Sequence, residues 1–138
     1  MTEILVCVLC RPHGVSRDQP RAGRALFEAI EVAALENNAP FHIRPVDCMS
    51  GCTRACTVAL QSPGKLTYFF GDLSPQAESA QQVLACAQLH DASPDGLLER
   101  AQRPSRMREG ILARLPPALP TSRRDHVQKP TVPSKVFP

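Results

Sequence analysis

Six cysteines in 138 residues constrain this chain more than any other feature, because five of them stand in two short groups. Cys7 and Cys10 are separated by two residues and end a run of aliphatic residues. Cys48, Cys52 and Cys56 follow one another with three residues between each pair. Thiolates that meet at one point repel each other unless a cation neutralises them. Two such groups therefore predict a metal centre, provided that the fold brings them together.

Local patterns in the first 90 residues predict alternating strands and helices. Strands are expected over 2–9, 41–47, 57–61 and 65–70, and helices over 21–37 and 75–90. Ser62-Pro63-Gly64 predicts a hairpin turn, and Ser74 before Pro75 predicts a helix N-cap. The order β-α-β-β-β-α predicts an α/β, thioredoxin-like fold with a mixed four-stranded sheet. The first two strands should be parallel, with a right-handed crossover.

This topology predicts where the cysteines meet. Parallel neighbouring strands end at the same edge of a sheet, so Cys7 and Cys10 should lie close to Cys48 and Cys52. We take these four cysteines as the metal ligands. Cys56 could be a further ligand or a packing residue. The sixth cysteine lies within the predicted second helix and is expected in the core.

The chemistry of the centre leaves alternatives open. Thiolates suit both zinc and iron–sulfur clusters, but the loop from Cys48 to Cys52 is one residue longer than a zinc knuckle, which favours the larger iron–sulfur cluster. A zinc-binding structural or metal-delivery module is the alternative. A thiol oxidoreductase using Cys7-x2-Cys10 ranks third, because Arg11-Pro12-His13-Gly14 follow the pair where a helix would be expected. No catalytic triad, phosphate loop or paired catalytic carboxylates are recognisable, so we expect a carrier more than an enzyme.

Charge and composition divide the chain. Residues 1–99 hold 7 Lys/Arg and 11 Asp/Glu, whereas residues 100–138 hold 9 and 2. Residues 103–114 could form a short basic helix, and six of the 14 prolines lie from Pro116 onward. We therefore expect one domain over 1–117 and a Pro-rich, basic, disordered tail over 118–138. This charge division indicates either electrostatic docking to a partner or a solvated tail. We expect the partner to be a redox or metal-accepting protein, and we expect neither a nucleic acid nor a membrane.

The start of the chain predicts the compartment. Met1 to Val6 contain no basic residue, and no stretch approaches the ~18 apolar residues that would cross a membrane. We expect a cytoplasmic protein, where clustered cysteines are metal ligands or redox thiols more often than disulfides.

The cysteine pattern resembles that of thioredoxin-like 2Fe–2S ferredoxins. That family supplies two cysteines after its first strand and a C-x3-C pair after its second, and Cys48-Met49-Ser50-Gly51-Cys52 matches the second pair. The first pair departs from the family, whose two cysteines are spaced more widely than Cys7 and Cys10. Cys56 is a further departure, since it stands near a common Ala-Pro step. The resemblance implies a 2Fe–2S centre.

A closer resemblance reaches about residue 117 and is to a bacterial family of predicted metal-binding proteins of unknown function. It is carried by Val6 to Arg11, by Arg44 to Leu60, by Pro63 to Leu73, and by Arg103 to Pro117. It implies a thioredoxin-like ferredoxin fold and, through neighbouring genes of its members, a weak link to cobalamin biosynthesis. No catalytic residue comes with it.

Overall fold

The computed structural model of the chain describes residues 1–119, so most of the predicted tail lies outside the described residues. In chain order the elements are β1 (Glu3–Cys7), α1 (Ala22–Glu36), β2 (His42–Val46), the 3-10 helix η1 (Cys52–Arg54), β3 (Val58–Gln61), β4 (Thr67–Phe70), α2 (Ala77–Ala92), the 3-10 helix η2 (Arg100–Gln102), α3 (Ser105–Glu109) and β5 (Ile111–Leu115). The predicted order β-α-β-β-β-α is confirmed up to α2.

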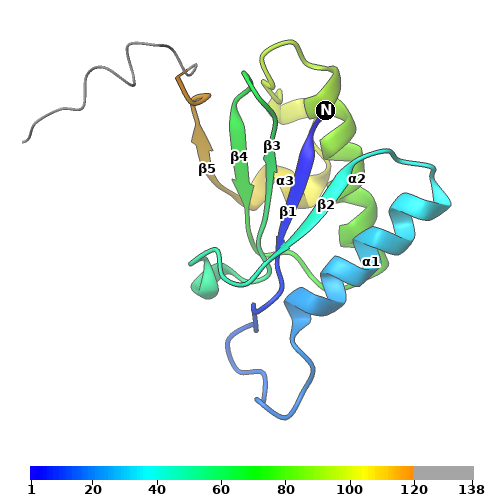
Figure 1. The fold of residues 1–138 in the computed structure, drawn as a ribbon. Coiled ribbons are helices and arrows are strands. Elements are labelled where there is room, and N and C mark those ends of the chain that lie inside the picture. Colours follow the sequence, from blue (N-terminus) through cyan, green and yellow to red (C-terminus); the bar gives the residue numbers. More distant parts are fainter. Residues whose placement is uncertain (120–138) are drawn as a thin grey trace, which may run out of the picture.

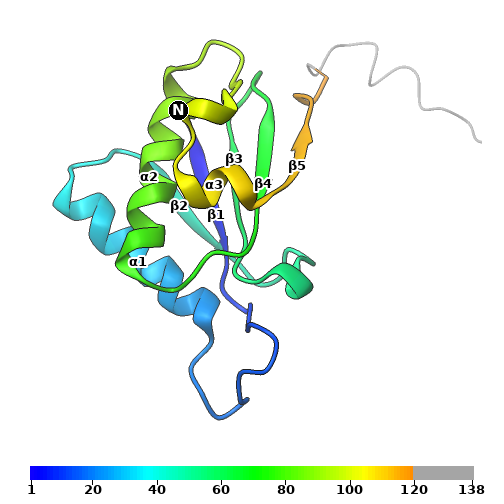
Figure 2. The same ribbon diagram turned by 180° about the vertical axis from the view of Figure 1, so that it is seen from behind.

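One five-stranded sheet runs in the order β2-β1-β3-β4-β5. β1 is parallel to β2, and the other pairs are antiparallel. The helices α1, α2 and α3 all lie on one side of the sheet, as the opposite views in Figures 1 and 2 show. The hydrophobic core therefore lies between this side of the sheet and the helices.

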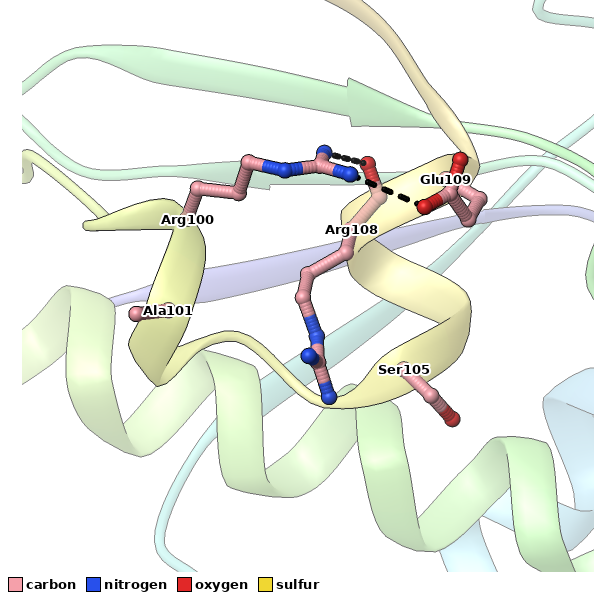
Figure 3. A pocket seen from close by; sticks show the side chains of 5 residues that line it. All are labelled: Arg100, Ala101, Ser105, Arg108 and Glu109. Atoms are coloured by element: carbon pink, nitrogen blue, oxygen red, sulfur yellow. Dashed lines mark hydrogen bonds and ion pairs between the residues drawn. The ribbon is translucent and has the colours of Figure 1, made fainter.

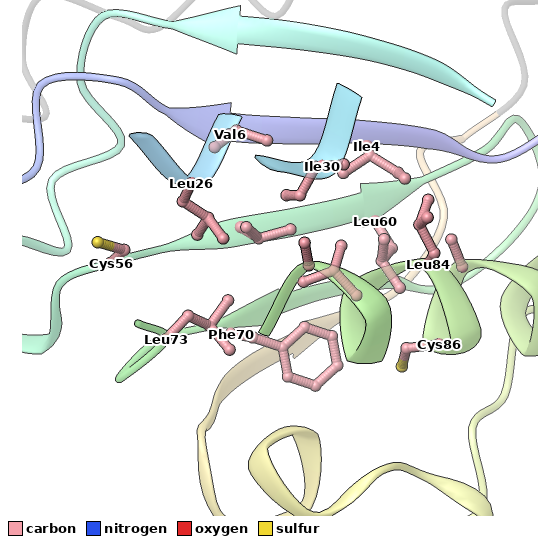
Figure 4. Close-up of a cluster of buried hydrophobic side chains, with 14 of the residues drawn as sticks. Ile4, Val6, Leu26, Ile30, Cys56, Leu60, Phe70, Leu73, Leu84 and Cys86 are labelled. Atoms are coloured by element: carbon pink, nitrogen blue, oxygen red, sulfur yellow. The ribbon is translucent and has the colours of Figure 1, made fainter. Parts of the chain in front are cut away.

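The core is built from the two expected periodicities. Ile4 and Val6 alternate along β1 toward the helices, and Leu26 and Ile30 repeat at helical spacing on α1; none of the four is exposed to solvent. Figure 4 shows these side chains together, with those from β3, β4 and α2. Cys86 is also fully buried in this core, so the prediction for the sixth cysteine is confirmed.

The fifth strand was not predicted. The expected basic helix over 103–114 ends at Glu109, and residues 111–115 pair with β4 instead. Gly110 permits this change of direction, because a Cβ there would lie 2.5 Å from the carbonyl oxygen of Gly71. Pairing satisfies the backbone groups on the open edge of β4, a tertiary gain that outweighs the helix propensity of the segment.

The second helix begins later than predicted. Its N-cap is Gln76 instead of Ser74. The hydroxyl of Ser74 lies 2.9 Å from that of Ser79, and the Ser79 hydroxyl oxygen also accepts the backbone N–H of Ser74. Ser74 thus ties the segment before α2 to the first turn of the helix without acting as its N-cap.

A buried histidine fixes the other end of α2 to the sheet. Nε2 of His90 lies 2.7 Å from the carbonyl oxygen of Leu66, so this nitrogen carries the proton and donates it. Nδ1 then accepts from the hydroxyl of Thr2, 2.7 Å away. His90 and Thr2 are both fully buried.

No helix among residues 1–119 is long and apolar enough to cross a membrane.

Candidate cysteine site

The loops that carry the two cysteine groups leave the sheet at the same edge. In the parallel pairing of β1 and β2, Cys7 is the partner of Val46, so Cys10 and Cys48 both follow shortly after paired strand ends. The backbone N–H of Cys7 also donates to the carbonyl oxygen of Thr57, at 3.2 Å. The segment that enters β3 therefore reaches the same edge, at the lower end of the sheet in Figure 1.

Three of the five cysteines at this edge form a buried inner group. Cys7, Cys10 and Cys56 have exposed fractions of 1%, 2% and 0%. Cys7 and Cys10 influence each other's pKa values, and the sulfur of Cys10 lies 3.5 Å from the hydroxyl of Thr57. Figure 4 shows Cys56 at the entry to β3, at the opposite end of the core from Cys86.

The surroundings of Cys7 lower the pKa of its thiol. Burial raises its pKa, but hydrogen bonds from the Cys10 thiol, from the backbone N–H groups of Met49 and Leu9, and from Thr57 together outweigh burial. The resulting pKa of Cys7 lies below the ordinary value for a thiol. Met49, in the loop after β2, is partly buried against the core cluster that includes Cys7.

The other two inner thiols are held neutral. Burial raises the pKa of Cys10, and so does its position as hydrogen-bond donor to Cys7. Burial raises the pKa of Cys56 to about 12, with contributions from the negative charges that Cys10 and Cys7 would carry. The three buried thiols thus influence one another's pKa values.

The remaining two cysteines form an exposed outer pair. Cys48 and Cys52 lie in the loop that contains η1, and both face solvent. The backbone N–H of Ser50 donates to the sulfur of Cys48 at 3.4 Å. Gly51 packs this loop onto the sheet, since a Cβ there would lie 2.6 Å from the methyl group of Thr57.

An ion pair fixes the far end of the loop. Nε of Arg54 lies 2.9 Å from each carboxylate oxygen of Asp72, and the backbone N–H of Asp72 donates to the carbonyl oxygen of Arg54. The hydrogen bonds from Arg54 lower the pKa of Asp72. Cys56 and Leu73 exchange two backbone hydrogen bonds of 3.0 and 3.1 Å. The cysteine loop is therefore anchored on both sides of Cys56.

The structure brings the predicted ligands to one edge without closing them around one point. Cys7 and Cys10 lie together with Cys56, whereas Cys48 and Cys52 are exposed beside them. Within residues 1–119, no three His, Cys, Asp or Glu side chains form a group that could hold a metal ion. The donor set nevertheless suits a thiolate-bound centre, because five soft sulfur ligands are available on three adjoining segments.

Two residues of this edge were not singled out from the sequence. Thr57 contacts Cys10 through its hydroxyl and Gly51 through its methyl group. Gly23 lets α1 approach the first cysteine pair, because a Cβ there would lie 2.1 Å from the carbonyl oxygen of Cys7. A glycine in the first turn of a helix is itself a signal of close packing.

The parallel β1-α1-β2 unit followed by antiparallel strands, with all helices on one side, defines a thioredoxin-like ferredoxin fold. The thioredoxin-like [2Fe-2S] ferredoxin from Aquifex aeolicus is similar in structure, with a TM-score of 0.52 and 19% identity over 86% of this chain and 96% of that chain. A cysteine-to-serine variant of that ferredoxin gives a TM-score of 0.52 and 18% identity over 82% of this chain and 99% of its own.

The chain belongs to the family described as "Protein of unknown function (DUF1636)", which matches residues 4–117. No curated protein matches its sequence. The resemblance inferred from the sequence, both to a family of unknown function and to thioredoxin-like ferredoxins, is confirmed.

Proposed function

We propose that this protein binds a 2Fe–2S cluster through Cys7, Cys10, Cys48 and Cys52, and that it transfers electrons or carries the cluster. The observation that supports the proposal most is that both cysteine pairs follow the paired ends of the parallel strands β1 and β2, at one edge of the sheet. The similar Aquifex aeolicus structure is that of a [2Fe-2S] ferredoxin. A bound cluster would supply a one-electron redox couple.

The inner pair, Cys7 and Cys10, and the outer pair, Cys48 and Cys52, would contribute differently to binding the cluster. Cys7 already receives hydrogen bonds that favour the thiolate, which is the form that binds metal. Cys48 and Cys52 are exposed on their loop, so ligands from that loop would keep the centre near the surface. A surface position favours exchange of electrons or of the cluster with a redox or metal-accepting protein partner.

The free thiols agree with a reducing compartment. None of the six cysteines forms a disulfide, and we propose that the protein works in the cytoplasm. The weak link to cobalamin biosynthesis remains a proposal that the resemblance alone supports.

Anaerobic isolation tests the proposed function directly. The full chain should be coloured, with iron and acid-labile sulfide in equal amounts and a visible absorption spectrum that reduction bleaches. Colourless protein that holds stoichiometric zinc and resists reconstitution with iron and sulfide would contradict the cluster and support the zinc-binding alternative.

The contact between Cys7 and Cys10 favours a second candidate, a thiol oxidoreductase. The two thiols influence each other, and their pKa values are displaced in opposite directions. Their near-complete burial argues against attack on a protein disulfide, so this candidate ranks lower. Replacing Cys48 and Cys52 together by Ser separates the two functions, because it should remove the cluster and leave any disulfide reductase activity intact.

A further inference from the structure

A pocket of about 420 Å³ lies between η2 and α3, on the helical side of the sheet. It is lined by Arg100, Ala101, Ser105, Arg108 and Glu109 (Figure 3). We propose that this pocket binds a small phosphorylated molecule, with the phosphate held by Arg108 and Ser105. No cysteine lines the pocket, so the proposal is independent of the function proposed above.

The surroundings of the pocket carry excess positive charge. Residues 100–114 contain five arginines and one glutamate. Glu109 is already neutralised, because Arg100 donates to its carboxylate at 2.9 Å and to the carbonyl oxygen of Arg108 at 3.0 Å. Arg103 is only 7% exposed and donates to the carbonyl oxygen of Met107, an uncharged acceptor. Its charge therefore adds to the positive potential of this region.

Arg108 is the cation that an incoming anion would meet. Its side chain extends into the space between the two short helices, as Figure 3 shows. Its Nε atom is buried without a hydrogen-bond partner among residues 1–119, as are those of Arg103 and Arg106, so an anion in the pocket would meet the terminal nitrogens of Arg108. In the same part of the chain, the ion pairs do not include the guanidinium of Arg108. Phosphate oxygens would accept hydrogen bonds from these two terminal nitrogens.

Ser105 adds a hydroxyl group to the lining of the same pocket. Its hydroxyl oxygen accepts from the side-chain amide of Gln82 at 3.4 Å, so its proton is free to be donated to an anion. Gln82 is held in turn, because its carbonyl oxygen accepts the backbone N–H of Arg106 at 2.9 Å. Ala101 provides an apolar wall, and the volume falls within the range of pockets that hold small organic ligands. These features favour a phosphorylated molecule over a free ion.

Calorimetric titration of the full chain with inorganic pyrophosphate tests the proposal. Binding to one site is expected. Arg108→Gln should weaken it at least tenfold, or about 1.4 kcal/mol. Arg114→Gln is the matched control, because it removes the same charge from exposed Arg114 on β5, outside the pocket. It should change the affinity less than about twofold.

The same titration defines the outcomes that would overturn the proposal. No binding at millimolar pyrophosphate, or equal losses in both arginine variants, would show that the pocket is not a specific site. Tighter binding of a glutamate-rich peptide, reduced equally by both substitutions, would instead indicate a surface for an acidic protein. If Arg108→Gln unfolds the chain, Ser105→Ala serves in its place, and unchanged affinity in that variant counts against the site.

Discussion

The hydroxyl of Thr57 lies 3.5 Å from the sulfur of Cys10, and both groups are buried at the edge where β1 and β3 meet. The carbonyl oxygen of Thr57 accepts the backbone N–H of Cys7 at 3.2 Å, and the methyl group of Thr57 lies against Gly51 of the cysteine loop. One side chain therefore connects the inner cysteine pair with the loop of the outer pair. Hydrogen bonds to cysteine sulfurs are a recognised influence on the reduction potential of an iron–sulfur cluster.

Replacing Thr57 by Val should make the midpoint potential of the reconstituted protein more negative, because a hydrogen bond to sulfur favours the more negative, reduced state. The unfolding free energy should fall by about 1 kcal/mol, the typical net value of one hydrogen bond. Thr57→Ser keeps the hydroxyl and is the control. Voltammetry and urea unfolding of both variants provide the measurements. Equal potentials in the Val and Ser variants would contradict the role of the hydroxyl.

Serine substitutions of Cys7, Cys10, Cys48 and Cys52 should each abolish or strongly weaken retention of the centre, because a lost thiolate opens the site to water. Cys56→Ser should have a smaller effect, and Cys86→Ser should leave the visible spectrum unchanged. Iron and sulfide analysis after anaerobic reconstitution distinguishes these outcomes. A centre lost in Cys56→Ser but retained in Cys7→Ser or Cys10→Ser would assign the loop from Cys48 to Cys56 as the main ligand source.

Gly23→Ala should separate α1 from the first cysteine pair. The new Cβ would lie 2.1 Å from the carbonyl oxygen of Cys7 and 3.1 Å from the backbone nitrogen of Cys10, so one of the two segments must shift. A loss of about 1–3 kcal/mol in unfolding free energy is expected, as for an overpacked core. The variant should also release its metal faster to a chelator.

Gly64→Ala is the control for that substitution, because nothing lies within 4 Å of a Cβ at this hairpin position. Its positive φ of 75° leaves only a local backbone cost. Chelator kinetics equal to those of the wild type are expected for Gly64→Ala. Equal kinetics in Gly23→Ala would show that the approach of α1 does not position the cysteines.

His90 should make stability depend on pH. Burial lowers its pKa in the folded protein, whereas the unfolded chain takes up a proton near the ordinary value of about 6.5. The unfolded state therefore binds more protons below this pH. The contribution of His90 is complete above about pH 6.5 and is lost as the pH falls toward the lower, folded-state pKa.

Urea unfolding between pH 5 and 8 measures this dependence. The unfolding free energy of the wild type should fall as the pH is lowered through the range below 6.5. In His90→Gln the fall should be smaller, although the variant should be less stable at pH 8, because the bonds to Thr2 and Leu66 are disturbed. Identical pH profiles for the two proteins would exclude His90 as the source.

Local sequence patterns were sufficient for most of the secondary structure. The apolar repeat that predicted a helix over 21–37 corresponds to α1, because one buried face imposes the helical period on the sequence itself. The cysteine spacing was similarly informative. Once the first two strands were taken as parallel, their shared edge followed from geometry, and the register of Cys7 with Val46 agrees with it.

Only the tertiary structure decided the features that depend on contacts between distant segments. Residues 111–115 form a strand because they lie beside the open edge of β4. The sequence of these residues alone does not indicate that this edge is available. The burial of Cys56 beside Cys7 and Cys10, with Cys48 and Cys52 exposed, follows from the path of the loop that Gly51 and Arg54 fix. Sequence spacing determines which thiols can meet, whereas packing across the sheet edge determines which of them are buried together.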